Sequence, residues 1–258
     1  NIDILIAMII FFIAKFKNIY LNIFLIILTS ISKFYPICLN VIFLFNKSLK
    51  DFLKYLFLTN IIIFTFLFFQ KESLLKIFEN KSMITVLSTS SYNFSFSGIL
   101  KSSIDVNGFI TLSCVLIFIL FIFLFIKKII SNNNVLDLLN SDIYENRLFI
   151  LSSTTLIFCY FVFTNWIYRE IFFLGLIPWI IKNNNNSNNN LPILLLVLLC
   201  LKFILTTLIV YIDLNNLFLN FETKLEFIKH SLDFFTISPF LVILFISILN
   251  FFKKSIYN

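Results

Sequence analysis

The sequence predicts an all-α, polytopic integral membrane helix bundle, and three observations carry this prediction. Sixty per cent of the 258 residues are hydrophobic and only 13% are charged, and the mean hydropathy is +0.99. A soluble domain carries about a quarter charged residues, so this chain lacks the polar side chains that would cover a globular surface. Apolar runs near the length of about 20 residues that one transmembrane helix needs recur along the chain.

The apolar runs predict roughly eight transmembrane segments in a single domain covering residues 1–258. In hydrocarbon every backbone polar group needs a partner within the protein, which a helix supplies by itself, and the runs lack the alternation of β-barrel strands. The predicted segments are 2–14, 19–45, 52–69, 83–100, 109–126, a long and a shorter one within 148–181, 191–212 and 234–252. Polar connecting loops are predicted at 71–82, 127–147 and 182–190.

The choice of apolar residues suggests where the gene resides. The chain has 37 Phe but only 3 Gly and 4 Pro, and its two arginines are Arg147 and Arg169. Residues with A/T-rich codons are abundant and those with G/C-rich codons are scarce. This bias favours an organelle-encoded respiratory protein. The net charge of +7 fits contact with anionic lipid headgroups and requires no nucleic acid.

Lys33 is the most informative charge within an apolar run. Charges in membrane segments are costly and usually face a protein interior or a water-filled path. Pro36 follows three residues later, and proline removes a backbone donor and disturbs a helix. A broken helix beside a charge is typical of ion sites in transporters. The alternative is a lysine at a helix end that extends its ammonium to the headgroups.

Other charges define further candidates. Arg169 and Glu170 adjoin a break between two apolar runs, either in a polar interior or in a short interfacial turn. Lys202 lies near the middle of a 22-residue run, from which headgroups are hard to reach, so a polar interior is predicted for it. His230 and Asp233 lie one helical turn apart and are interpreted as an interfacial pair rather than a metal site.

Serine and threonine are abundant in the predicted segment 83–100, which includes Ser88, Ser90 and Ser91. Hydroxyl groups make a poor lipid-facing surface, but they can hydrogen-bond across helices or hold water. This segment is therefore predicted to line a hydrated channel inside the bundle.

No catalytic, phosphate-binding or haem motif occurs in the sequence. The four cysteines lie far apart in apolar stretches without metal-ligand spacing, which favours buried small hydrophobic side chains. We therefore expect no cofactor, and no metal, in this chain; structural lipids such as cardiolipin are compatible with it.

The order of these features resembles the antiporter-like subunits of respiratory complex I, most of all the NADH dehydrogenase subunit 2 family. The family has an intramembrane lysine in a K-x-x-P setting, here Lys33 to Pro36. A Gln then ends the next helix, here Gln70, and a basic residue leads into an L-A-Y-S-S helix start, here Lys81 and 87–91. Later family features, an acidic-Leu loop and a broken helix ending in a cation, correspond to VLDLLNSDIYENRLF and to Arg169.

Three departures accompany this resemblance, which covers roughly residues 20–258. Phe94 stands where the family usually has a histidine, and the Gly-Pro helix break before Arg169 is absent. The first five or so helices of the family, which hold its buried glutamate, have no counterpart. Either a separate chain supplies them or the subunit is shortened.

The resemblance implies a membrane-arm subunit of the proton-pumping NADH:ubiquinone oxidoreductase in the mitochondrial inner membrane. It implies an enzyme subunit without a redox centre of its own, and other membrane-arm subunits and lipids as partners. Lys33 would be a central protonatable site, 83–100 would hold water, and Lys81, Arg169, Glu170 and Lys202 complete the candidates for the proton path. Three alternatives stay open: ATP synthase subunit a, cytochrome oxidase subunit 3, and a non-pumping structural subunit.

Overall fold

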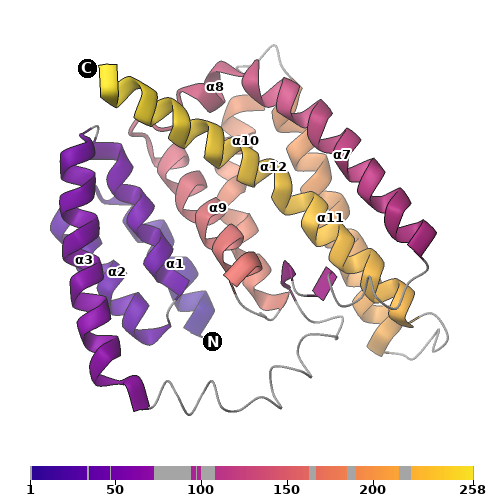
Figure 1. The fold of residues 1–258 in the computed structure, drawn as a ribbon, viewed down its shortest axis with the longest axis horizontal. Coiled ribbons are helices and arrows are strands. Elements are labelled where there is room, and N and C mark those ends of the chain that lie inside the picture. The colour runs from indigo at the N-terminus through magenta and orange to yellow at the C-terminus, as the bar shows by residue number, and fades with distance from the viewer. Residues whose placement is uncertain are drawn as a thin grey trace.

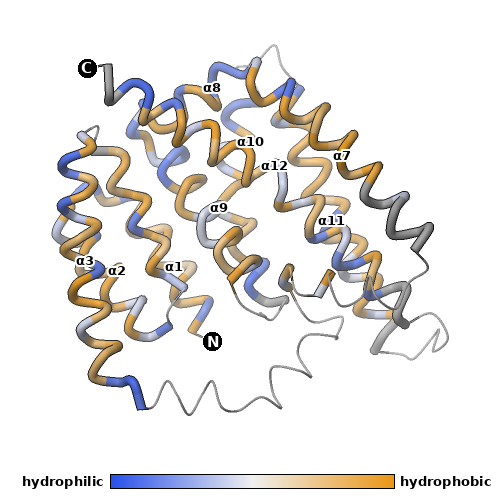
Figure 2. The backbone as a smooth tube through the Cα atoms, viewed as in Figure 1, coloured by the Kyte–Doolittle hydropathy of each residue, from blue (hydrophilic) through white to orange (hydrophobic). Residues whose placement is uncertain are grey.

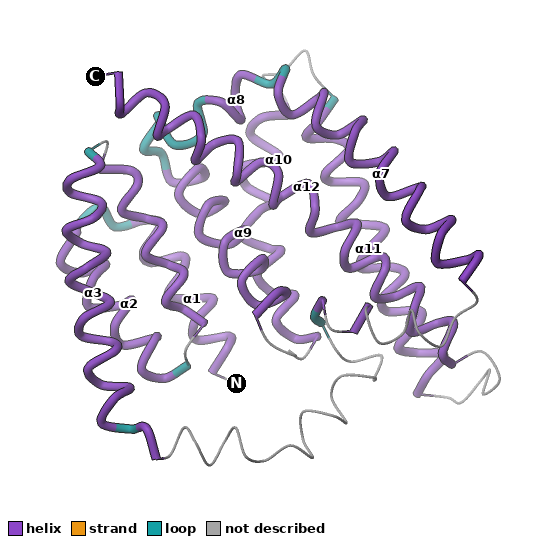
Figure 3. Tube along the Cα trace, in the orientation of Figure 1, coloured by secondary structure: helices purple, strands orange, loops and turns teal. Residues whose placement is uncertain are grey.

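A computed structural model describes the chain at residues 2–33, 35–46, 48–72, 94–96, 98–99, 108–162, 167–184, 190–214 and 222–257. Over these residues the protein is a bundle of helices joined by short loops, with no β-strand among them (Figure 3). The predicted all-α fold class is confirmed to this extent.

The helices are arranged around one central helix, α9 (Figure 1). In chain order they are α1 (Ile2–Lys15), α2 (Ile19–Ser32), the 3₁₀ helix η1 (Tyr35–Asn46), α3 (Leu49–Phe69), α7 (Gly108–Ile130), α8 (Asn133–Leu136), α9 (Tyr144–Val162), the 3₁₀ helix η2 (Ile167–Leu176), α10 (Ile177–Asn184), α11 (Leu191–Leu214) and α12 (Glu222–Tyr257). The connection between α7 and α9 therefore covers 131–143 and contains α8.

Helix α9 lies at the centre because nearly every side of it is covered. It packs against α1, η1, η2, α10 and α12, and most of its side chains are buried. On one side α1, α2, η1 and α3 form a subgroup, and on the other α11 and α7 pack against the long helix α12. A helix enclosed on all sides needs no polar face, and α9 has none over most of its length.

Local signals in the sequence fix several helix ends. The side chains of Asn18 and Ser48 accept hydrogen bonds from the backbone amides of Leu21 and Asp51, capping the starts of α2 and α3. Helix α2 ends at Ser32, and Lys33 adopts an extended backbone. A continued helix would bring the ring of Pro36 against the carbonyl of Ser32, four residues earlier.

Pro239 lies inside α12, and a neighbouring serine compensates for it. A proline has no amide proton, so the carbonyl of Phe235, four residues earlier, loses its helical donor. The hydroxyl of Ser238 donates to that carbonyl at 3.1 Å. The helix thus continues through the proline with this backbone group satisfied.

Three helices in the described part of the chain are long and apolar enough to cross a membrane, namely Leu49–Phe69, Leu191–Ile212 and Glu226–Lys254. The prediction of roughly eight spans is wrong for this part. The run 19–45, predicted as one segment, divides into α2 of 14 residues and η1 of 12, about 21 and 24 Å long. A bilayer core is about 30 Å thick. The run 148–181, predicted as a long and a shorter segment, forms α9 of 19 residues, η2 of 10 and α10 of 8, none of which is among the three candidate spans.

The helices are predominantly hydrophobic along their lengths (Figure 2), and many of their large apolar side chains are exposed. In α3 only 11% of the apolar window is buried, and Phe57, Phe64 and Phe68 are more than half exposed. A soluble protein does not leave such a large contiguous apolar area in water. The described structure is that of a helical protein suited to a membrane.

Candidate functional site

Three side chains from other elements lie around a carboxylate at the start of α1. Asp3 is 1% exposed. Lys33 Nζ lies 2.6 Å from its Oδ2, the hydroxyl of Tyr35 donates to its Oδ1 at 2.6 Å, and Arg169 Nε lies 3.8 Å from Oδ1. The Arg169 guanidinium also lies 4.8 Å from the centre of the Tyr35 ring. We call these four residues the Asp3 cluster.

A second group of charges lies between η2, α11 and α12. Lys202 Nζ contacts Glu170 Oε1 at 2.7 Å and also pairs with Asp233. Lys229 Nζ lies 2.9 Å from Asp233 Oδ2, and His230 Nδ1 lies 3.8 Å from the same oxygen. These five residues form the Asp233 cluster, and all of them are buried.

The two clusters are one peptide bond apart. Arg169 belongs to the Asp3 cluster and Glu170 to the Asp233 cluster, so η2 joins them through consecutive residues. Acidic and basic groups therefore alternate across the bundle from Lys33 to Lys229. Buried ions are tolerated only when they are paired, and this pairing spans five elements: α1, the end of α2, η2, α11 and α12.

Aromatic side chains enclose the Asp233 cluster. The ring of Phe94 lies 5.9 Å from Lys202 Nζ and packs edge-on against Tyr160 and Phe173. All three rings are fully buried. Rings around an ion pair keep water away and so strengthen the attraction between its charges.

Both 3₁₀ helices carry residues of these clusters. Tyr35 begins η1, and Arg169 and Glu170 lie in η2. Runs of 3₁₀ helix longer than about four residues are uncommon and often mark a functional hinge, because their hydrogen-bond geometry is poorer than that of an α-helix. At 12 and 10 residues, η1 and η2 are unusually long examples.

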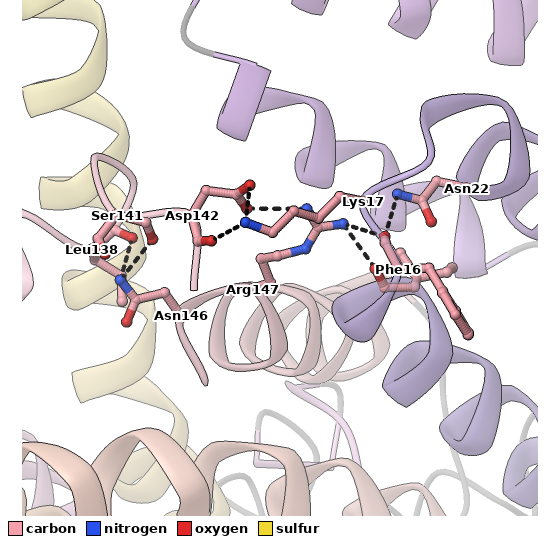
Figure 4. Close-up of polar contacts among 9 residues, drawn as sticks. Phe16, Lys17, Asn22, Leu138, Ser141, Asp142, Asn146 and Arg147 are labelled. Atoms are coloured by element: carbon pink, nitrogen blue, oxygen red, sulfur yellow. Dashed lines mark hydrogen bonds and ion pairs between the residues drawn. The ribbon is translucent and has the colours of Figure 1, made fainter. Parts of the chain in front are cut away.

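A third polar cluster has a structural role at the opposite end of α1 (Figure 4). Arg147 donates to the backbone carbonyls of Ile13 and Phe16 at 2.9 and 2.8 Å, and it pairs with Asp142 at 3.0 Å. Lys17 contacts the same carboxylate at 2.9 Å. Burial raises the pKa of Asp142, but the hydrogen bonds from Lys17 and Arg147 outweigh burial and leave this pKa below its ordinary value.

The two arginines thus hold α1 at both ends. Arg147 binds the carbonyl groups that end the helix, which carry partial negative charge, and Arg169 approaches the carboxylate in its first turn. Sequence position alone gives no sign of this arrangement, because the residues in each pair are more than 100 positions apart.

The structure brings four of the candidate residues into this system. Lys33 and Arg169 share Asp3, and Glu170 pairs with Lys202. Pro36, predicted to break a helix, is the second residue of η1. The remaining candidates, Lys81, Ser88, Ser90 and Ser91, lie outside the described residues, as does most of the predicted segment 83–100.

His230 and Asp233, predicted as an interfacial pair, are fully buried within the bundle, at 1% and 0% exposure. They lie where α12 packs against α11, since Asp233 pairs with Lys202 of α11. Lys202 occupies the polar interior predicted for it, at 0% exposure.

Sequence reasoning missed three participants, Asp3, Tyr35 and Lys229. Asp3 is the only acidic residue in the first apolar run, and that isolation is a signal in itself, since a lone carboxylate in such a run needs a cation. Lys229 precedes Asp233 by four residues, the spacing at which helical side chains meet.

Among the residues that the structure describes, no group of three His, Cys, Asp or Glu side chains is placed to hold a metal ion. Comparison of the chain with models of known protein families, with curated proteins and with solved structures gave no match. The site must therefore be interpreted from its own chemistry.

Proposed function

We propose that this chain is a membrane subunit of a proton-translocating respiratory complex, of the antiporter-like NADH dehydrogenase subunit 2 class, in the mitochondrial inner membrane. The observation that carries the proposal is the alternation of buried acids and bases from Lys33 through Asp3, Arg169, Glu170, Lys202 and Asp233 to Lys229. Charges in a membrane interior mark ion or proton paths by default.

The pairing suggests how a proton would move. Lys202 lies between Glu170 and Asp233, so its ammonium is stabilised while both carboxylates are close. Withdrawal of one carboxylate removes part of that stabilisation, and desolvation then favours the neutral amine and release of the proton. The same argument applies to Lys33 with Asp3.

Helix η2 is the element best suited to produce such a movement. It carries Arg169 and Glu170, one residue for each cluster. Ten residues are about 20 Å long as a 3₁₀ helix and about 15 Å as an α-helix. Conversion between the two forms would shift Glu170 along and around the helix axis relative to Lys202, and it would move Arg169 relative to Asp3 at the same time.

In this role the chain would supply no redox centre, and electron transfer from NADH to ubiquinone would belong to other subunits of the complex. Asp3 supports the proposal, since it provides a buried carboxylate beside Lys33. Both arginines are engaged within the chain, which disfavours the ATP synthase stator, whose essential arginine acts on a rotating ring. His230 pairs with Asp233 in the interior, which gives no support to cytochrome oxidase subunit 3.

The assembly that contains the chain tests the proposed class. Membranes are solubilised in mild detergent and separated on a native gel, and the chain is located by mass spectrometry. We expect it in the band that oxidises NADH. Migration with ATP hydrolysis activity or with cytochrome oxidase would refute the proposed class.

Proton translocation by the purified assembly in proteoliposomes tests the role of the clusters. Lys33→Arg and Lys202→Arg keep a cation beside each carboxylate, but arginine does not release its proton in proteins. We expect both variants, and Lys33→Ala, to pump fewer protons per NADH oxidised. Lys254→Arg, at an exposed pair with Asp137, is the matched control. Full pumping by both arginine variants would instead indicate a structural subunit.

A further inference from the structure

At one end of the bundle, segments that are distant in the sequence lie close together. Lys17, two residues after α1, binds Asp142, and Lys182 near the end of α10 pairs with Glu145 at 3.0 Å. Lys254 in the last turns of α12 lies 3.4 Å from Asp137. Helix α7 ends three residues before α8 begins, at this same end (Figure 1).

This end of the bundle, which we call the cationic end, has a large excess of positive charge. It comprises the segments 15–17, 127–147 and 253–254 together with Lys182. Basic residues there number eight and acidic residues three, a net formal charge of +5. The basic residues are Lys15, Lys17, Lys127, Lys128, Arg147, Lys182, Lys253 and Lys254. Most of these lysines are exposed, so their charge faces outward rather than into the bundle.

The opposite end has the reverse balance in the described residues. Outside the buried clusters, the described side chains at the helix ends there include Lys71 against two acidic residues, a net formal charge of −1. The acidic residues are Glu72 and Glu226. Figure 1 shows the end of α3, the end of α11 and the start of α12 on this side, away from α8.

Such an asymmetry has two physical consequences in a membrane. Lysine and arginine near membrane segments are retained on the side from which the chain is inserted, and this bias sets orientation. Anionic lipid headgroups also attract basic residues at the membrane surface. Both effects act on the same lysines, which lie where the helices leave the apolar region.

We propose that the cationic end binds anionic phospholipid headgroups in the leaflet facing the compartment where the chain is made, and thereby fixes the orientation of the bundle. The opposite end, with the starts of α1 and α12, then faces the other compartment. The basis is charge and position, so this inference stands independently of proton translocation.

Cysteine accessibility tests the orientation. In a background without the four native cysteines, Ser131→Cys marks the cationic end and Glu72→Cys the opposite end, both at exposed positions. A membrane-impermeant maleimide is applied to sealed membrane vesicles of known sidedness. We expect Ser131→Cys to be labelled only from the side of synthesis and Glu72→Cys only from the other. The reverse pattern overturns the proposal, and labelling after detergent addition verifies that each cysteine is reactive.

Removal of lysine charges tests whether the cationic end determines the orientation and binds the lipid. The variant Lys127→Gln, Lys128→Gln, Lys253→Gln, Lys254→Gln lowers the charge of the cationic end by four without touching the buried clusters. We expect this variant to insert in both orientations. Both proteins are also extracted from vesicles of phosphatidylcholine and phosphatidylglycerol and examined by native mass spectrometry. We expect the unmodified protein to retain bound phosphatidylglycerol and the variant to lose it. Lys71→Gln is the control. A variant with unchanged orientation and unchanged lipid retention refutes the proposal, as does displacement of the retained lipid by inorganic phosphate.

Discussion

Removal of the Lys202 ammonium by substitution with methionine should destabilise the protein strongly. Lys202 is fully buried and touches two carboxylates, Glu170 at 2.7 Å and Asp233. At 2.7 Å and an effective dielectric constant of about 20, one such attraction amounts to about 6 kcal/mol before the cost of desolvation. Desolvation offsets much of this value, but Lys202→Met leaves both carboxylates buried with fewer cations. Breaking a buried pair in this way costs about 3–5 kcal/mol.

A double-substitution cycle separates the ion pair from side-chain packing. Glu170→Gln alone leaves an excess cation, whereas Lys202→Met with Glu170→Gln restores the formal charge balance of the Asp233 cluster. We expect the double variant to cost about 1–3 kcal/mol less than the sum of the two single variants, the coupling found for residues in direct contact. The free energy of unfolding is measured by denaturant titration in detergent micelles, with helical circular dichroism as the signal.

The control for this cycle is Lys182→Met at an exposed pair. The side chains of Lys182 and Glu145 are 40% and 28% exposed, and such pairs contribute about 0–1 kcal/mol. If Lys202→Met costs no more than this control, or if the two substitutions at Lys202 and Glu170 are additive, the buried pair is not the interaction that the structure indicates.

Three further outcomes follow from the packing around α9. In Arg147→Lys the lysine cannot bind both the α1 carbonyls and Asp142. The substitution should therefore lower the free energy of unfolding by about 2–3 kcal/mol and speed proteolysis within α1. Unchanged protection of α1 from proteolysis would contradict the role assigned to this arginine. Because the folded pKa of Asp142 is depressed, its stabilising contribution is present above its unfolded pKa of about 3.9 and is lost as the pH falls through the folded pKa. Asp142→Asn should therefore flatten the fall in the unfolding midpoint below that pH, and an unchanged acid profile would count against the pairing. Gly175→Ala would place its Cβ 2.0 Å from Ser152 Oγ and should lower the free energy of unfolding by about 1–3 kcal/mol. Adding Ser152→Gly should restore this stability. A loss that persists in the double variant would show that contact with Ser152 is not its cause.

Helical content is readable from the sequence because it follows from composition. With few charges and long apolar runs, backbone groups have no partner except their own helix. The number of spans was not readable in the same way. In the run 19–45 the α-helix ends at Lys33, where an ion pair with Asp3 and the restriction imposed by Pro36 coincide. The mean hydropathy of the run detects neither of these features.

Individual buried charges could also be recognised in advance, since Lys202 has no route to the headgroups from the middle of its run. Their partners could not. Asp3 and Lys33 are 30 residues apart, and Glu170 and Lys202 are 32 residues apart, distances at which only the packing of helices decides contact. The burial of His230 and Asp233 could not be predicted for the same reason, since it depends on the helices that pack against that part of α12.

The sequence by itself determined that this protein is helical, apolar and suited to a membrane, and it marked Lys33, Arg169, Glu170 and Lys202 as charges in need of partners. These properties depend on composition and local order alone. Only the tertiary structure decided which charges meet, and only it sorted the scattered lysines to one end of the bundle. Along the chain, basic residues occur between the apolar runs and show no bias toward either end of the bundle, because the chain reverses direction from helix to helix. In the folded bundle those reversals place many of them together at the cationic end, whereas the described side chains at the other end have a small acidic excess.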